Sequence, residues 1–175
     1  MASVWYGHYE SPIGRLLIAH SERGLLALEF AYKPDHRPAA EREGWVESRE
    51  RAASVVRELE EYFAGERREF KVPLDLRGTD FQRACWQQLR RIPYGETRSY
   101  LDISRAVSSE GAVRAVGQAN HYNPVAIIVP CHRVINTTGK LGGYGGGLDV
   151  KAKLLRLEGA AVDGLSDSGQ RGLFA

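Results

Sequence analysis

Short apolar segments alternate with turn residues over the first thirty positions of the chain. The segments span residues 5–9, 15–20 and 24–30, and Ser, Pro and Gly residues separate them. Apolar runs of this length, bounded by such residues, are typical of β-strands. The pattern predicts three strands, a polar loop over residues 32–43, and one further strand at Phe70 and Val72.

Residues 47–64 carry apolar side chains at helical spacing. Steps of three and four residues indicate an amphipathic helix, and Gly65 suits its C-terminal cap. The apolar positions are Ala52, Val55, Val56, Leu59, Tyr62 and Phe63. We therefore predict that residues 1–77 form a small antiparallel sheet with one packed helix, and that residues 73–78 are a linker.

The second half of the chain has a helical pattern. Thr79 is placed to cap a helix that runs to about Arg91, with Cys85 on its apolar core face. Ser99 is placed to cap a short helix over residues 100–107, and a second helix is expected over residues 112–120. Two short helices joined by a tight turn are typical of a helix-turn-helix, and they also occur as plain scaffold.

A last helix is expected over residues 149–158, ending at Gly159, and the tail beyond it carries no motif. The predicted fold class is α/β (α+β). The predicted division is an N-terminal domain at 1–77, a mostly helical domain at 78–159, and a tail at 160–175.

Composition excludes several classes of protein. The chain has 175 residues, of which 43% are hydrophobic and 26% charged, and no apolar run approaches the ~20 residues of a membrane span. The first residues lack the features of a secretory signal. The two cysteines and five histidines show no zinc-binding spacing. We expect a cytoplasmic protein with reduced thiols, no membrane association, no metal and no cofactor.

Charge is divided unevenly along the chain. Residues 1–77 hold 12 Lys and Arg against 14 Asp and Glu, whereas residues 78–175 hold 12 against 8. The net charges are −2 and +4. A basic C-terminal half suits a polyanion such as nucleic acid, although a solvated surface gives the same count.

Cys131 lies in an unusual setting. It is followed by His132 and Arg133, it comes after an apolar run at 125–129 that we interpret as extended, and a glycine-rich stretch at 142–147 lies beyond it. A thiol is a strong nucleophile only as the thiolate, which neighbouring cations and hydrogen bonds favour. The alternative is that Cys131 is a small buried apolar residue.

Three residues oppose the local preference of their predicted helices. Gly117 costs ~1 kcal/mol relative to Ala inside a helix, which indicates a close approach by another helix or by a nucleic-acid groove. Arg114 lies in a first helical turn, where a cation is disfavoured, so it is either solvated or positioned to enter DNA. Glu158 lies in a last turn, where an anion is disfavoured unless a cation or histidine is near.

These motifs occur together in one family. Four strings followed by Glu158 resemble the O6-alkylguanine-DNA alkyltransferases, specifically from about residue 79 to 158 and more loosely over residues 1–77. The strings are Arg114-Ala115-Val116-Gly117, Asn123-Pro124, Pro130-Cys131-His132-Arg133-Val134 and Gly143-Tyr144. The resemblance implies a ribonuclease H-like N-terminal domain and a winged-helix-like C-terminal domain.

The activity that the resemblance implies is direct-reversal DNA repair. Cys131 would take the alkyl group from O6-alkylguanine, and from O4-alkylthymine, irreversibly and once per molecule. His132 would be the base, oriented by Glu158, while Asn123 would fix the loop that carries Cys131. Tyr100 would give a proton or hydrogen bond to guanine N3. Because neighbouring side chains on an extended chain diverge, we expect a water, as in the family mechanism, to relay the proton.

The implied partner is double-stranded DNA, bound by a monomer in the minor groove without sequence preference. Arg114 would fill the stack that the extruded nucleotide leaves. The small residues of the same helix would fit the narrow groove. The expected DNA-contacting residues are Arg114, Ala115, Gly117, Ala119, Asn120 and Ser99, and the expected substrate pocket comprises Val134, Tyr144, Gly145 and Lys151.

Two other functions fit the residues taken alone. A cysteine hydrolase that uses Cys131, His132 and Glu158 would turn over esters or amides without DNA. A DNA-binding module with an inert cysteine would bind DNA without reacting. Incubation with DNA that contains methylated guanine distinguishes these three functions.

Overall fold

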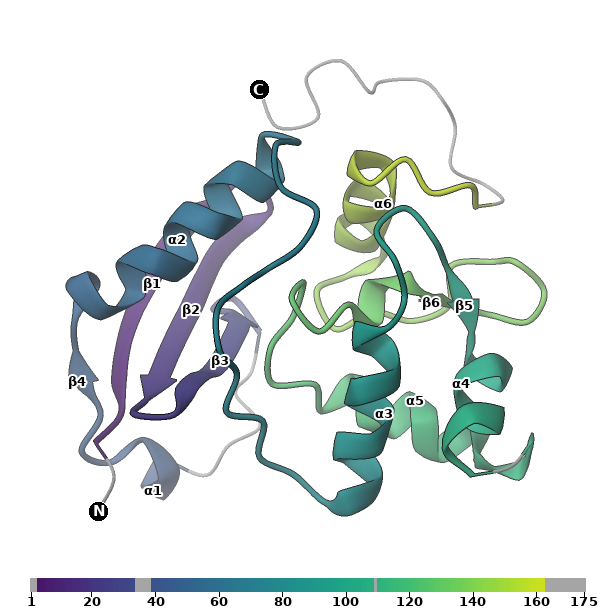
Figure 1. Cartoon of the computed structure of the whole chain (residues 1–175), viewed down its shortest axis with the longest axis horizontal. Coiled ribbons are helices and arrows are strands. Elements are labelled where there is room, and N and C mark those ends of the chain that lie inside the picture. Colours follow the sequence, from purple (N-terminus) through teal and green to yellow (C-terminus); the bar gives the residue numbers. More distant parts are fainter. Residues whose placement is uncertain (1–2, 34–38, 109, 163–175) are drawn as a thin grey trace. The chain divides into compact units, whose positions relative to one another are not determined.

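The computed structural model describes residues 3–33, 39–108 and 110–162 (Figure 1). The chain forms two compact units. The N-terminal unit comprises residues up to Arg77 together with Pro124–Ala126, and the C-terminal unit comprises Gly78–Asn123 and the chain from Ile127 onward. A small sheet with a packed helix and a mostly helical second unit confirm the predicted fold class.

The sheet of the N-terminal unit is built on three consecutive antiparallel strands. These are β1 (Trp5–Ser11), β2 (Gly14–Ser21) and β3 (Gly24–Phe30), and they confirm the three predicted strands. A short strand, β4 (Val46–Glu47), pairs parallel to β1 and completes the order β3-β2-β1-β4. The sequence gives no sign of β4, because two exposed residues are too few to show an alternating pattern.

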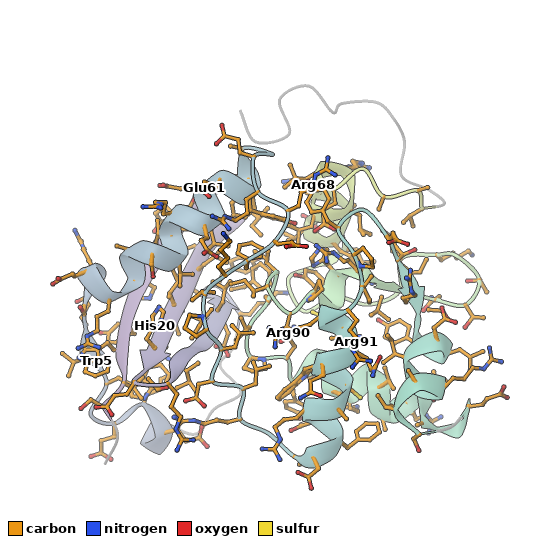
Figure 2. All side chains as sticks on the ribbon, viewed as in Figure 1. Trp5, His20, Glu61, Arg68, Arg90 and Arg91 are labelled. Carbon is orange, nitrogen blue, oxygen red and sulfur yellow. The ribbon has the colours of Figure 1, made fainter. Side chains whose placement is uncertain are left out.

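Helix α2 (Arg49–Phe63) packs on this sheet, as predicted. Ser48 caps its first turn, and Gly65 follows its end at a φ of 77°. Gly7 lets the helix approach β1, because a Cβ there would lie 3.2 Å from that of Ala52. The guanidinium of Arg51 lies 3.5 Å from the ring centroid of Trp5. Trp5 opens β1 and is labelled in Figure 2.

The predicted loop and the predicted fourth strand need correction. Residues 39–42 form a short helix, α1 (Ala39–Arg42), whereas residues 34–38 of the predicted loop lie outside the described residues. Residues 70–72 form no strand. The chain pairs with β3 slightly later, where Leu25 donates to the carbonyl of Pro73 at 2.8 Å and accepts from Asp75 at 2.8 Å.

A second distant segment also pairs with β3. The amide of Leu28 donates to the carbonyl of Pro124 at 2.9 Å, and the amide of Ala126 donates back to Leu28 at 2.9 Å. Val125 thereby forms an isolated parallel bridge with Leu28. The segment that precedes Cys131 is therefore fixed to the sheet edge by main-chain hydrogen bonds.

Helices α3 (Asp80–Arg90), α4 (Tyr100–Val107) and α5 (Val113–His121) pack on one another in the C-terminal unit (Figure 1). The predicted caps are confirmed, since Thr79 and Ser99 both form capping boxes. Cys85 is fully buried, as predicted. A 3-10 turn, η1 (Glu110–Ala112), leads from the α4 side into α5, and this connection matches a helix-turn-helix.

The remaining elements of this unit are short, apart from one helix. Strands β5 (Arg98–Ser99) and β6 (Val134–Ile135) form a parallel pair, with the 3-10 turn η2 (Cys131–Arg133) directly before β6. Helix α6 (Leu148–Leu157) follows the glycine-rich stretch. Turn η2, strand β6 and helix α6 contribute residues to the site described below.

Gly24→Ala should destabilise the N-terminal unit by about 2–4 kcal/mol, at the upper end of single-residue effects. Gly24 has a φ of 150°, and an added Cβ would lie 2.5 Å from the carbonyl oxygen of Pro73. Gly44→Ala is the matched control, because Gly44 also has a positive φ, 86°, but no atom lies within 4 Å; its cost is about 1 kcal/mol. Urea unfolding measures both, and equal losses would contradict the steric explanation.

Candidate active site

Cys131 stands on a tight turn rather than on an extended chain. Ile127 has a φ of 70°, which is unfavourable for a β-branched residue. Pro130, at φ −83° and ψ 66°, centres an inverse γ-turn in which the Cys131 amide donates to Val129 at 2.8 Å. The prediction of an extended run at 125–129 is therefore wrong. Cys131 and His132 lie in the 3-10 turn η2, so their side chains do not diverge in the way that neighbouring side chains do on an extended chain.

Asn123 braces this turn from the end of α5. Its Nδ2 donates to the carbonyl of Val129 at 2.8 Å, two residues before the cysteine. The same side chain also hydrogen-bonds the Cys131 thiol. One amide thus connects the chain that enters the turn with the sulfur atom.

The Cys131 thiol is almost enclosed, with 9% of the residue exposed. Burial raises the pKa of the thiol, while the Asn123 hydrogen bond, the Lys151 charge and a hydrogen bond from its own backbone act in the opposite direction. Because burial dominates, the resting form is the thiol. A nucleophilic role therefore requires a group that takes the proton.

A buried carboxylate organises the residues that follow the cysteine. Nε2 of His132 lies 2.8 Å from Oε1 of Glu158, the residue that caps the C-terminus of α6. Arg133 binds the same carboxylate with Nε and Nη2, each at 2.9 Å, and its Nη1 donates to the carbonyl of Ile92 at 2.7 Å. The guanidinium of Arg133 and the imidazole of His132 thus remove the helix-end conflict that the sequence showed at Glu158.

Burial alone would raise the pKa of Glu158. The interactions with His132, together with those with Arg133, outweigh the effect of burial. They hold the pKa of Glu158 well below its usual range. Glu158 is therefore ionised at any physiological pH. Sequence reasoning missed the role of Arg133, although an arginine beside an apolar turn and an acid at a helix end were both visible.

One nitrogen of His132 has no partner. His132 is fully buried, and its Nδ1 is shielded from solvent without a hydrogen bond to any described residue. No direct hydrogen bond joins it to the Cys131 thiol in the described part of the chain. With Nε2 committed to Glu158, Nδ1 is the nitrogen available to accept a proton.

The pairing of β5 with β6 places Tyr100, which follows β5, near the turn that carries Cys131. Arg98 pairs with Val134, so the residue that opens α4 lies beside the chain that leaves η2. The Tyr100 hydroxyl donates to the carbonyl of Gly143 at 3.4 Å. Burial raises the pKa of Tyr100, a negative charge on Cys131 would raise it further, and a hydrogen bond with the Asn120 side chain lowers it.

Lys151 ties the strand and the glycine-rich stretch together. It is fully buried on α6, and its Nζ donates to the carbonyls of Val134 at 2.6 Å, Gly143 at 3.1 Å and Leu141. Burial lowers the pKa of Lys151 to about 8, although a negative charge on Cys131 opposes the shift. The predicted pocket residues Val134 and Lys151 thus lie in one network, and Tyr144 and Gly145 follow in the same stretch.

The predicted DNA-contacting residues of α5 fall into an exposed group and a buried group. Arg114 and Ala115 are exposed, and a Cβ on Gly117 would meet no atom within 4 Å. Ala119 is 2% exposed, and its carbonyl accepts from Nε1 of Trp86 at 2.9 Å. The prediction that Ala119 contacts a groove is wrong, because its side chain packs in the core.

Asn120 also needs correction. Both polar atoms of its amide are shielded from solvent, and the amide acts on the pKa of Tyr100. It is therefore directed inward, toward the residues around the cysteine, rather than toward an external groove. Ser99 is half-buried, and its hydroxyl accepts from Asp102 as the α4 cap.

Neither a cluster of metal ligands nor a membrane-spanning helix occurs among the described residues. Across residues 3–33, 39–108 and 110–162, no group of three or more His, Cys, Asp or Glu could hold a metal ion. Within the same residues, none of the helices has both the length and the apolar character to cross a membrane.

The geometry places one enclosed cysteine directly before the buried His132–Glu158 pair. Residues 4–76 match the family model "6-O-methylguanine DNA methyltransferase, ribonuclease-like domain", and residues 80–160 match that of the "DNA binding domain". The chain belongs to the 6-O-methylguanine DNA methyltransferase family, which confirms the resemblance seen in the sequence.

Individual relatives are similar over most of their length. A methylated-DNA–protein-cysteine methyltransferase of Mycolicibacterium paratuberculosis is 51% identical over 158 residues, covering 89% of this chain and 92% of that protein. Its counterpart from Methanosarcina acetivorans is 48% identical, covering 90% and 99%. The crystal structure of Mycobacterium tuberculosis OGT in complex with DNA gives a TM-score of 0.83 at 49% identity, covering 88% of this chain and 92% of that chain.

Glu158→Gln should cost about 3 kcal/mol of stability at neutral pH, because it leaves Arg133 buried without its counter-charge. The depressed pKa of Glu158 means that its contribution is complete above the unfolded value of about 4.3 and is lost as the pH falls below it. The variant should therefore lose less stability than the wild type between pH 5 and pH 3.

Urea unfolding at several pH values tests this expectation. Glu96→Gln is the matched control, since Glu96 is exposed and lies 3.6 Å from Arg98, an ion pair worth about 0–1 kcal/mol. Equal effects of the two substitutions would show that the buried carboxylate is not stabilising.

Proposed function

We propose that Cys131 is the residue that accepts the alkyl group in direct-reversal DNA repair. Membership of the family gives the reaction, transfer of a methyl group from damaged DNA to a cysteine of the protein itself. The observation that carries the assignment is the setting of Cys131, which Asn123 hydrogen-bonds and which directly precedes the His132–Glu158 pair. Cys85 is fully buried on α3, and burial raises its pKa with no opposing group.

The reaction is a displacement at carbon. The sulfur of Cys131 attacks the alkyl carbon, a carbon–sulfur bond forms, and the bond between that carbon and guanine O6 breaks with its electron pair left on the base. The thiol proton leaves through a bridging water to Nδ1 of His132, the nitrogen that has no other partner. Glu158 accepts from Nε2 and stabilises the imidazolium that results. The thioether is a poor leaving group, so each molecule acts once.

The departing base needs charge compensation. Tyr100 supplies a proton or hydrogen bond at guanine N3. Main-chain groups of Val134 and Gly145 recognise the base, and Tyr144 forms a wall of the pocket. Lys151 is a positioning residue in this scheme, since its ammonium joins three carbonyls of the surrounding chain.

The DNA substrate is double-stranded and is bound in the minor groove without sequence preference. A base inside a duplex is out of reach, so the damaged nucleotide rotates out of the helix. Exposed Arg114 fills the gap, and Ala115 and Gly117 give α5 a slim surface for the groove. The similar Mycobacterium tuberculosis protein crystallised with DNA supports this partner.

The functional division of the chain falls at residue 78. Residues 78–159 carry every proposed catalytic, pocket and DNA-contacting residue, and residues 1–77 carry none. The tail at 160–175 has no proposed role, and residues 163–175 lie outside the described residues. We propose that the protein acts as a cytoplasmic monomer and that it also accepts O4-alkylthymine.

Incubation with an oligonucleotide that carries O6-methylguanine should add one methyl group to each protein molecule. Intact-mass analysis measures the stoichiometry, and peptide mapping should place the methyl group on Cys131. Cys131→Ser should abolish transfer while it retains DNA binding, and Cys85→Ser should react like the wild type. Continued turnover without a covalent product would indicate the hydrolase instead, and binding without any product would indicate an inert DNA-binding module.

Arg114→Ala should slow transfer from duplex DNA by roughly 10- to 100-fold, because the extruded state loses the side chain that fills the stack; extrusion itself costs a few kcal/mol. Reaction with free O6-benzylguanine should be unchanged, since a free base needs no extrusion. Arg83→Ala, at an exposed arginine on α3, is the matched control. Equal slowing on duplex and free base would count against the role of Arg114.

A further inference from the structure

Helix α5 begins without a side-chain cap of its own. Ala112 occupies the N-cap position, and its side chain forms no cap hydrogen bond with any described residue. The first amides of a helix have no partners within that helix, and a polar side chain normally accepts from one of them. Helices α3 and α4 of the same unit begin with complete capping boxes at Thr79 and Ser99. The start of α5, two residues before Arg114, is therefore fixed in another way.

A buried serine of α4 supplies the missing contact. The hydroxyl oxygen of Ser104 accepts from the amide of Ala112 at 3.1 Å, although eight residues separate the two along the chain. In a capping box this amide is bound by the third residue of the same helix, which in α5 is Ala115. Ser104 is fully buried, and α4 packs on both η1 and α5. Because a close-packed side chain has little freedom to move, its oxygen gives the start of α5 a defined position.

The same serine also takes part in the end of α4. Its main-chain carbonyl accepts from the amide of Ser108, the residue that caps the C-terminus of α4, at 3.0 Å. An ion pair crosses the same connection, in which Arg105 binds Glu110 through Nε at 3.0 Å and Nη2 at 2.7 Å. Both of those side chains are exposed, so the ion pair contributes little. The buried hydroxyl of Ser104 is therefore the stronger constraint on how α5 leaves α4.

This constraint bears on the arginine that is proposed to enter DNA. Arg114 is exposed in the first turn of α5, and the terminal turns of a helix open most easily. The hydrogen bond at Ala112 holds the main chain two residues before Arg114. The direction in which Arg114 projects from the protein therefore depends on Ser104.

We propose that Ser104 is a positioning residue for the repair reaction, whose hydroxyl holds the start of α5 so that Arg114 projects toward the gap in the base stack. The proposal rests on the proposed function, in which Arg114 fills that gap. A fully buried side chain does not reach DNA, so Ser104 acts through Arg114.

Ser104→Ala removes the hydroxyl and nearly keeps the side-chain volume, so the variant should fold. It should slow methyl transfer from duplex DNA that carries O6-methylguanine by about 2- to 30-fold, the factor that corresponds to the loss of a helix cap. Transfer from a single strand of the same sequence should change little, because its base need not be extruded from a pair. Intact mass against time measures both rates. Their ratio within one variant does not depend on the folded fraction.

Thr79→Ala is the matched control. It removes the hydroxyl that caps α3, which accepts from the amide of Gln82 at 3.1 Å. The control therefore loses a cap of the same kind at a helix that does not carry Arg114, and it should keep the wild-type ratio of duplex to single-strand rates.

A double variant tests whether Ser104 acts through Arg114. Residues that act as one unit are not additive, so Ser104→Ala should cause no further slowing on duplex DNA when Arg114→Ala is already present. Slowing by both substitutions independently would overturn the role of Ser104.

The remaining outcomes are equally decisive. An unchanged ratio in Ser104→Ala, or an equal fall of the ratio in Thr79→Ala, would overturn the role of Ser104 and leave alkyl transfer to Cys131 intact. A wild type that takes no methyl group from either form of DNA would overturn the proposed function as well.

Discussion

The buried carboxylate of Glu158 is the interaction on which the site depends. A single side chain at the end of α6 fixes the imidazole of His132 through one oxygen and the guanidinium of Arg133 through both. Since Arg133 also binds the carbonyl of Ile92, the end of α3, the η2 turn and the end of α6 are held together. A charge of this kind is expensive to bury alone, so the three side chains are stable only as a set.

This arrangement explains how an enclosed thiol can react. Burial favours the protonated form of Cys131, so the reaction that we propose needs a base beside it. In the proposed reaction, Glu158 accepts from Nε2 of His132, and Nδ1 is left to take the thiol proton.

Local chemistry made much of the fold predictable from the sequence. Thr79 and Ser99 were identified as helix caps because a hydroxyl at that position satisfies free amides of the first turn. The three strands and α2 followed from spacing alone. The errors at residues 70–72 and 125–129 have a common cause. Next to each segment, at Pro73 and at Pro124, the chain pairs with β3, a partner that is distant in the sequence and that no local pattern reveals.

The site could be predicted by residue type but not by orientation. Cys131, His132 and Glu158 were visible as a constellation, whereas the side-chain directions of Ala119 and Asn120 depend on how α5 is rotated against Trp86 and Tyr100. The helical repeat shows which residues share a face of α5. Which of those faces packs against the rest of the protein is known only from the structure. The same holds for Lys151, whose burial depends on three carbonyls from separate points of the chain.

The pairing of Pro124–Ala126 with β3 also has a consequence for how the protein matures. Strand β3 emerges early from the ribosome, and its edge stays without this partner until much of the remaining chain has been synthesised. Long-range pairings of this kind form slowly. The segment that leads to Cys131 can therefore take its place beside β3 only after most of the chain has left the ribosome.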